Sequence, residues 1–134
     1  MSTIFSKIIA REIPGHFVYE DDFCVVIMDK YPALLGQSMV ILKREVDYLF
    51  TLTDEEYQRL MQVAKNVALA SDKAFGVTRS CLVVEGFEVS HVHIKIYPTP
   101  DTVTNLGNVM CERVEARDDN LAEQAQMIKA ELQI

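Results

Sequence analysis

The sequence has 134 residues, of which 49% are apolar and 25% charged, and this composition is ordinary for a globular protein of one domain. Its net charge of −7 argues against binding to nucleic acid or to an anionic membrane, because both need a basic surface. The three cysteines are widely spaced, and no run approaches the ~20 apolar residues of a membrane span. We therefore expect a single domain over residues 1–134, with reduced thiols, in the cytoplasm.

The first half of the chain predicts a short helix followed by three strands. Apolar residues recur at helical spacing within residues 5–12, and Pro14 with Gly15 ends this pattern. Runs rich in β-branched and aromatic residues, separated by an acidic turn and by a connection that contains Pro32 and Gly36, predict strands. These strands cover residues 16–21, 23–29 and 38–44.

The second half begins with the clearest helix of the sequence, over residues 51–76. Thr53 and Glu56 form a capping-box pattern at its start, and Gly76 is a typical helix stop. The polar residues between 98 and 118 match no element. Two strands and a C-terminal amphipathic helix are predicted at residues 79–86, 90–98 and 119–134. Five strands and two main helices predict an α+β fold with a mostly antiparallel sheet.

Residues 88–100, EVSHVHIKIYPTP, contain two of the three histidines. Period-two alternation places His91, His93 and Lys95 on one side of a strand and apolar residues on the other. Such a face is open to three interpretations: histidines on a solvated sheet, a pair of metal ligands, or catalysis by a neutral imidazole. In the third, Lys95 supplies a fixed positive charge for an anionic group and opposes protonation of the neighbouring histidine.

Several blocks in a fixed order extend this motif to a resemblance with a known family. They read IFSKIIAREIPGHFVYEDD, VVIMDKYPALLGQSMVILKR, LTDEEYQRLMQVAKNVALASDKAFG and HVHIKIYP. Residues 4–98 resemble the histidine triad (HIT) family of nucleotide hydrolases and transferases, whose signature alternates three histidines with apolar residues. The resemblance implies a HIT-like, five-stranded antiparallel sheet crossed by one long helix. It also implies a homodimer whose two sheets join into a ten-stranded layer.

The resemblance implies roles for individual residues as well. His93 matches the nucleophile, which attacks the α-phosphorus of a nucleoside phosphoester or phosphoramidate and forms a nucleotidyl-histidine. His91 matches the first histidine, whose backbone carbonyl orients the nucleophile ring. Asp29 matches the acidic residue that accepts from both ribose hydroxyls, with Ile27 facing the base. From the residues alone, Asp29 fits a turn before Pro32 equally well.

The chain departs from the family pattern on the phosphate side. Lys95 replaces the third histidine, and a lysine is a poor proton shuttle at neutral pH unless its pKa is lowered. The segment before the motif is shorter than in the family, and Val84 stands where an asparagine is expected. Glu88 falls near the place of a phosphate-binding hydroxyl, where a carboxylate repels phosphate unless Lys95 or Arg79 pairs with it.

The zinc site of many bacterial relatives lacks its thiolates here. Its N-terminal C-x-x-C pair aligns with Thr3 or Ser2 and with Ser6, and its histidine aligns with Glu45. We therefore expect no metal ion and no cofactor.

Two hypotheses about function remain open. The first is a HIT-type hydrolase or transferase that acts on a small nucleotide, with a purine favoured. The alternative is a catalytically weak or inactive HIT-fold module that binds a nucleotide or a protein partner, and the short phosphate loop with Glu88 favours it. A third and weaker hypothesis is a protein that binds a metal ion through its H-x-H motif. The residues expected to carry the first function are His93, His91 and Lys95 in catalysis, and Asp29, Ile27 and Glu88 in nucleotide binding.

Overall fold

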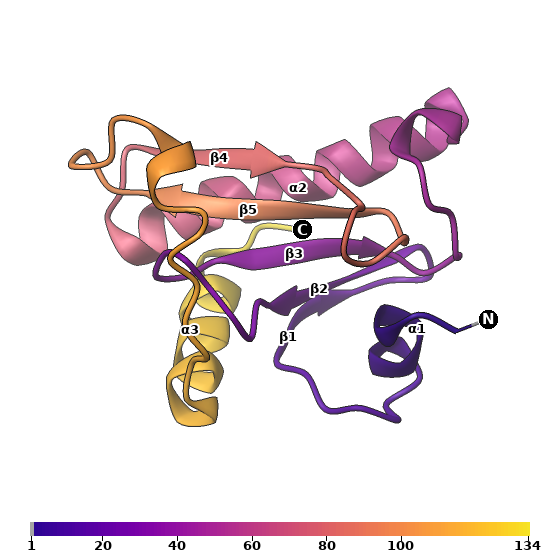
Figure 1. The fold of residues 1–134 in the computed structure, drawn as a ribbon, viewed down its shortest axis with the longest axis horizontal. Helices are drawn as coiled ribbons and strands as arrows, with labels where there is room; N and C mark the ends of the chain where they lie inside the picture. The colour runs from indigo at the N-terminus through magenta and orange to yellow at the C-terminus, as the bar shows by residue number, and fades with distance from the viewer. Residues whose placement is uncertain (1) are drawn as a thin grey trace.

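A computed structural model describes residues 2–134. Five strands form one antiparallel sheet in the order β1-β2-β3-β5-β4 (Figure 1). Their bounds are β1 Phe17–Glu20, β2 Cys24–Met28, β3 Ser38–Leu42, β4 Arg79–Val83 and β5 His93–Thr99. The expected α+β fold, with a five-stranded antiparallel sheet, a long helix and a C-terminal helix, is confirmed.

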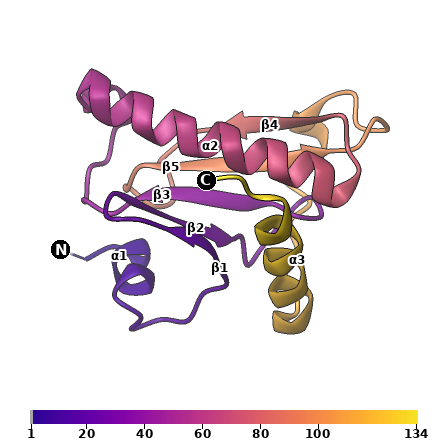
Figure 2. The ribbon, with the colours of Figure 1, turned by 180° about the vertical axis from the view of Figure 1, so that it is seen from behind.

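The two main helices cover one face of the sheet, and a short helix lies on the other (Figures 1 and 2). The helix α2 has the predicted capping box of Thr53 and Glu56 at its start, and it ends where Gly76 adopts a left-handed conformation. No helix in residues 2–134 is both long and apolar enough to cross a bilayer. The helices are α1 Ile4–Ile9, α2 Asp54–Phe75 and α3 Asp118–Glu131, with 3-10 turns η1 Leu49–Thr51 and η2 Leu106–Asn108.

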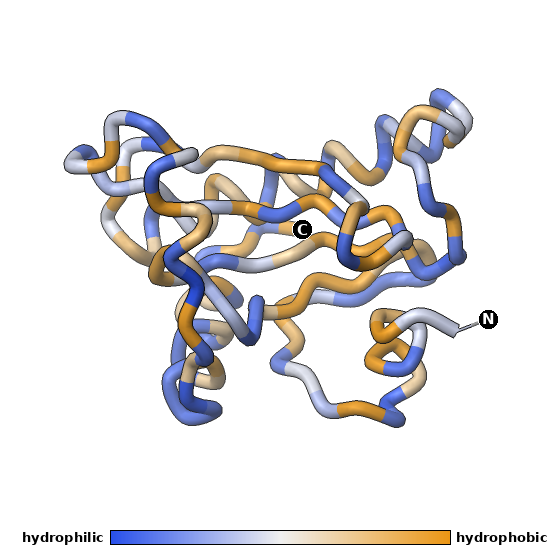
Figure 3. The backbone as a smooth tube through the Cα atoms, in the orientation of Figure 1, coloured by the Kyte–Doolittle hydropathy of each residue, from blue (hydrophilic) through white to orange (hydrophobic). Residues whose placement is uncertain are grey.

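The central strands are buried on both faces, which explains their unbroken apolar sequence. Every residue of β2 and β3 is buried, and the hydrophobic colour in Figure 3 follows these strands. The larger cluster faces α2 and α3 and includes Val26, Val40, Leu60, Ile94 and Ile96. The smaller cluster faces α1 and contains Phe5, Ile8, Val25, Ile27, Met39 and Ile41. The two clusters fix which side of each strand faces which helix.

The unassigned stretch between β5 and α3 crosses in front of the sheet in Figure 1. Its backbone is held beside the β2–β3 connection, because the Ala116 N–H donates to the Lys30 carbonyl at 2.9 Å and the Val114 N–H donates to the Pro32 carbonyl at 3.4 Å. A polar segment without helical or strand periodicity therefore has a defined path over the molecule.

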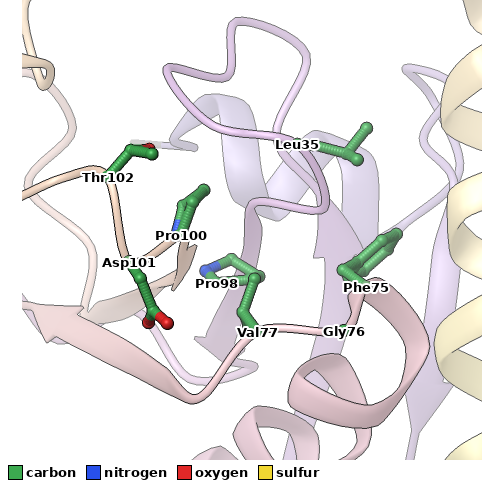
Figure 4. A pocket seen from close by; sticks show the side chains of 8 residues that line it. All are labelled: Leu35, Phe75, Gly76, Val77, Pro98, Pro100, Asp101 and Thr102. Carbon is green, nitrogen blue, oxygen red and sulfur yellow. The ribbon is translucent and has the colours of Figure 1, made fainter.

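An open pocket of about 260 Å³ lies where the C-terminal end of β5 meets the end of α2 (Figure 4). Its apolar lining is Leu35, Phe75, Val77, Pro98 and Pro100. His93 begins β5, so this pocket lies at the opposite end of the strand from the histidine motif.

Gly36 generates a stability prediction, because it has φ +81° and an added Cβ would overlap the Phe75 ring. Gly36→Ala should lower the free energy of unfolding by about 3 kcal/mol, through backbone strain and overpacking. Gly76→Ala is the matched control: its φ is +64°, but no atom lies within 4 Å of the added Cβ. It should therefore cost only the backbone strain, about 1–2 kcal/mol. Urea denaturation measures both changes, and equal losses would contradict the predicted clash.

Candidate functional site

His93 is the first residue of β5, and its imidazole is almost fully buried, with 5% of the residue exposed. Its Nδ1 lies 2.7 Å from the backbone carbonyl oxygen of His91. Because a carbonyl can only accept, Nδ1 carries the proton and Nε2 keeps its lone pair. Burial lowers the pKa of His93, against the hydrogen bond to His91, and the positive charge of Lys95 lowers it further. The result is a neutral, oriented imidazole with one free nitrogen.

His91 lies just before β5 and is fully buried. Its Nε2–H donates to the Leu42 carbonyl at 2.6 Å, so its Nδ1 accepts from the Thr3 hydroxyl at 2.7 Å. The predicted strand over 90–98 begins later than expected. The His91 N–H turns back to the Val89 carbonyl instead of joining the ladder. With both ring nitrogens engaged, the side chain holds the His91 carbonyl in place for His93.

The positions aligned with zinc ligands form a hydrogen-bonded cluster around His91. Thr3 caps α1 by accepting from the Ser6 N–H at 3.1 Å, and a Glu45 carboxylate oxygen accepts from the Ser6 hydroxyl and from the Thr3 N–H. Two neutral hydroxyls do not fit zinc, which prefers thiolate, imidazole and carboxylate ligands. Within residues 2–134, no three His, Cys, Asp or Glu side chains are placed to hold a metal ion. The expected lack of zinc stays a prediction.

Asp29 directly follows β2 and is buried, with 7% exposed. One carboxylate oxygen accepts from the Gln37 side-chain amide at 2.8 Å, and the other accepts from the Tyr31 N–H at 2.9 Å. The turn interpretation is therefore correct as a description of its local contacts. Each carboxylate oxygen retains further acceptor capacity. Asp29 thus combines a structural role with the capacity to bind additional hydroxyl donors.

Lateral strand pairing places Ile27 and Lys95 in one row on the α1 side of the sheet. Met39 on β3 pairs with Ile27 on one side and with Lys95 on the other, and Val83 pairs with Lys95 from β4. Within residues 2–134, no carboxylate lies within ion-pair distance of the Lys95 ammonium group. Ile27 is buried beneath α1 with Phe5, whose ring also packs edge-on against His93 at 4.7 Å between ring centroids. The site face thus has an apolar side at α1 and a cationic side at β5.

Sequence reasoning missed the partner of Glu88. It named Lys95 or Arg79, but Arg79 lies at the far end of β4, opposite Thr99. The Glu88 carboxylate pairs with Arg113, with Nη2–Oε1 at 3.1 Å and Nη1–Oε2 at 3.4 Å. Arg113 comes from the stretch that matched no element, and no local pattern marks it. The hydrogen bonds from Arg113 are the main reason that the pKa of Glu88 is lowered.

Comparison with known proteins gives a consistent picture. The HIT domain family matches residues 10–102. An uncharacterised 13.1 kDa HIT-like protein of Mesomycoplasma hyorhinis is 33% identical over an alignment of 100 residues that covers 71% of this chain and 90% of the relative.

Two solved structures resemble this chain over nearly its whole length. A HIT-like protein involved in cell-cycle regulation from Bartonella henselae has a TM-score of 0.85 and 27% identity, covering 98% of this chain and 96% of that one. A hypothetical histidine triad nucleotide-binding protein from Sulfolobus tokodaii has a TM-score of 0.81 and 28% identity, covering 96% and 90%.

The hydrogen bond between Thr3 and His91 generates a second stability prediction. Thr3→Val keeps the side-chain shape but removes the hydroxyl, so His91 Nδ1 loses its donor and α1 loses its cap. We expect a loss of about 2 kcal/mol in the free energy of unfolding. Thr3→Ser keeps the hydroxyl and should stay within about 0.5 kcal/mol of the parent. Urea denaturation compares them, and equal stability of the two variants would refute the role of the hydroxyl.

Proposed function

The chain belongs to the HIT domain family, and on that premise we propose that it binds a small nucleotide and cleaves it at the α-phosphate through His93. The observation that supports this most directly is the neutral His93 imidazole, with Nδ1–H donated to the His91 carbonyl and Nε2 free. A buried imidazole held in one orientation satisfies the main requirement of nucleophilic catalysis, namely a lone pair aimed in a fixed direction. A purine nucleotide is the favoured ligand.

In the proposed reaction, the Nε2 lone pair of His93 attacks the α-phosphorus, and the bond from phosphorus to the leaving oxygen or nitrogen breaks. The leaving group takes that electron pair and a proton from solvent, and the water that attacks in the next step returns a proton to solvent. Water then attacks the phosphorus of the nucleotidyl-histidine, which releases the nucleoside monophosphate and restores neutral His93. His91 acts as a positioning residue through its carbonyl. Lys95 places its positive charge on the same face, where it stabilises the phosphate oxygens.

Asp29 and Ile27 are proposed to bind the nucleoside. Asp29 keeps acceptor capacity beyond its bonds to Gln37 and Tyr31, so it can accept from the two ribose hydroxyls. The Gln37 amide fixes the carboxylate orientation, which lowers the entropy cost of binding. Ile27 is only 2% exposed in the apolar cluster beneath α1, so it is proposed to support the base site from within that cluster.

The alternative function, a nucleotide-binding or protein-interaction module with little turnover, is favoured by one specific observation. Lys95 stands where the family has its third histidine, and an ammonium group donates a proton poorly at neutral pH. With Lys95 in place of the third histidine, the protein would bind a nucleotide but release its leaving group slowly or not at all. Turnover and binding measured on one preparation separate the two functions.

We also propose a homodimer in which β4 pairs with its counterpart in a second copy. β4 is at the edge of the sheet, and among the described residues its only strand partner is β5. Leu82 of β4 and the adjacent Val84 are partly exposed, and Leu69 on α2 is also exposed. An apolar, unpaired strand edge of this kind favours association with another strand.

His93→Ala should reduce turnover of a purine nucleoside phosphoramidate by at least about 10³-fold, while binding of the nucleoside monophosphate is largely kept. His16→Ala is the control, because His16 lies outside the site and contacts Asp118. Burial, with the positive charge of Lys95, lowers the pKa of His93 below its ordinary value, so the neutral ring persists into more acidic solution than a free imidazole. Turnover should therefore fall with acid at a lower pH than the ordinary histidine pKa would give. Full activity of His93→Ala would exclude His93 as the nucleophile.

The dimer predicts a particle of twice the chain mass at micromolar concentration, measured by multi-angle light scattering. Leu82→Lys introduces a charge on the β4 edge without opening the core, because Leu82 is already 39% exposed. It should shift the mass to that of one chain. A monomer mass for the parent protein would reject the β4 interface and leave the fold unaffected.

A further inference from the structure

Arg113 is held at the edge of the site by backbone contacts of its own segment. The Val114 and Ala116 N–H groups donate to the carbonyls of Pro32 and Lys30, and Lys30 directly follows Asp29 in the β2–β3 connection. Arg113 therefore approaches the site from the side of the proposed ribose contact.

The Arg113 guanidinium reaches across to the loop that precedes His91. Both of its terminal nitrogens bond to Glu88, at 3.1 and 3.4 Å, one to each carboxylate oxygen. This two-point geometry also matches a phosphate group, whose oxygens have similar spacing. Arg113 thus presents two N–H donors side by side, and the Glu88 carboxylate already accepts from both.

The surrounding charges place this ion pair at the border of the proposed phosphate site. The pKa of Glu88 is lowered mainly by the bonds from Arg113, and the positive charge of Lys95 lowers it further. The pKa of Arg113 is raised mainly by Glu88, with added effects of Asp29 and Tyr97. The Glu88 carboxylate therefore lies within the electrostatic reach of Arg113 and of the face that carries Lys95 and His93.

The ion pair between Glu88 and Arg113 is exposed enough for a ligand phosphate to replace the Glu88 carboxylate. The Glu88 side chain is 72% exposed and that of Arg113 is 38% exposed, and ion pairs in such positions contribute little to stability. A phosphate group carries more negative charge than a carboxylate and accepts charge-assisted hydrogen bonds from guanidinium. The Glu88 carboxylate can therefore be displaced without loss of the fold.

We propose that Arg113 binds the second phosphate of a nucleoside diphosphate or a longer phosphate chain, and that Glu88 occupies this position until the ligand arrives. The proposal rests on the proposed function, because the first phosphate is assigned to His93 and Lys95. It names a substrate class: nucleotides with at least one phosphate beyond the α-phosphate. A monophosphate leaves the Glu88–Arg113 pair intact and gains nothing from Arg113.

Calorimetric titration with adenosine monophosphate and adenosine diphosphate tests this assignment. Arg113→Ala should weaken diphosphate binding about tenfold and change monophosphate binding by less than about twofold. Arg113→Lys should be intermediate, because it keeps the charge but loses the fork. Arg117→Ala is the matched control: it removes the same charge from the same segment, but Arg117 pairs with Asp119. It should change neither affinity.

Two further variants identify which phosphate is affected. Lys95→Ala should weaken both ligands by a similar factor, because both carry the α-phosphate. Glu88→Gln should strengthen diphosphate binding several-fold by removing the competing carboxylate, with a smaller effect on the monophosphate. Added salt should reduce the difference between the diphosphate and the monophosphate.

The outcomes separate failure of this inference from failure of the proposed function. If the parent protein binds the monophosphate and Lys95→Ala weakens it, but Arg113→Ala changes both ligands equally or neither, the second-phosphate role is wrong and the proposed function stands. If the parent protein binds neither nucleotide, both are wrong. A loss confined to the diphosphate in Arg113→Ala, and absent in Arg117→Ala, supports the assignment.

Discussion

The hydrogen bond from His93 Nδ1–H to the His91 carbonyl is the contact on which the proposed chemistry of this site depends. It fixes the tautomer of His93 and leaves Nε2 unprotonated. It can do so only because His91 is itself immobile, with its ring bonded to the Leu42 carbonyl and to the Thr3 hydroxyl. Thr3, Leu42 and His91, which lie far apart in the chain, thereby determine the direction of the Nε2 lone pair of His93. The short helix α1 belongs to this arrangement, since Thr3 is also its cap.

Electrostatics imposes the second constraint, because a chain with a net charge of −7 must gather positive charge locally to bind an anion. Lys95 lies on the same side of β5 as His93. Arg113 comes from the segment between β5 and α3 and pairs with Glu88, in the loop before His91. A carboxylate that looks unfavourable for phosphate binding in the sequence is therefore neutralised in the folded protein. The effect of Glu88 on a bound anion depends on how readily that anion can replace its carboxylate at Arg113.

Much of the fold was predictable from local pattern, and the errors have physical causes. The α2 helix was identified because Thr53 and Glu56 cap it and Gly76 ends it. Alternation alone predicts a start of β5 at residue 90, which is too early, because it cannot reveal that the His91 N–H turns back to the Val89 carbonyl. Residues 100–117 show no periodicity, and the bonds from Val114 and Ala116 to the β2–β3 connection are backbone bonds that need no amphipathic face.

The sequence by itself determined the strand alternation that puts His93 and Lys95 on one side, and the hydroxyl-bearing residues Thr3 and Ser6 near the start of the chain. These properties are local, so spacing and residue type are sufficient to read them. Only the tertiary structure decided that Thr3 bonds to His91, 88 residues away, and that Arg113 pairs with Glu88, 25 residues away. Such contacts depend on the path of the chain in space. A hydroxyl or a guanidinium carries no local signal of the partner it will meet.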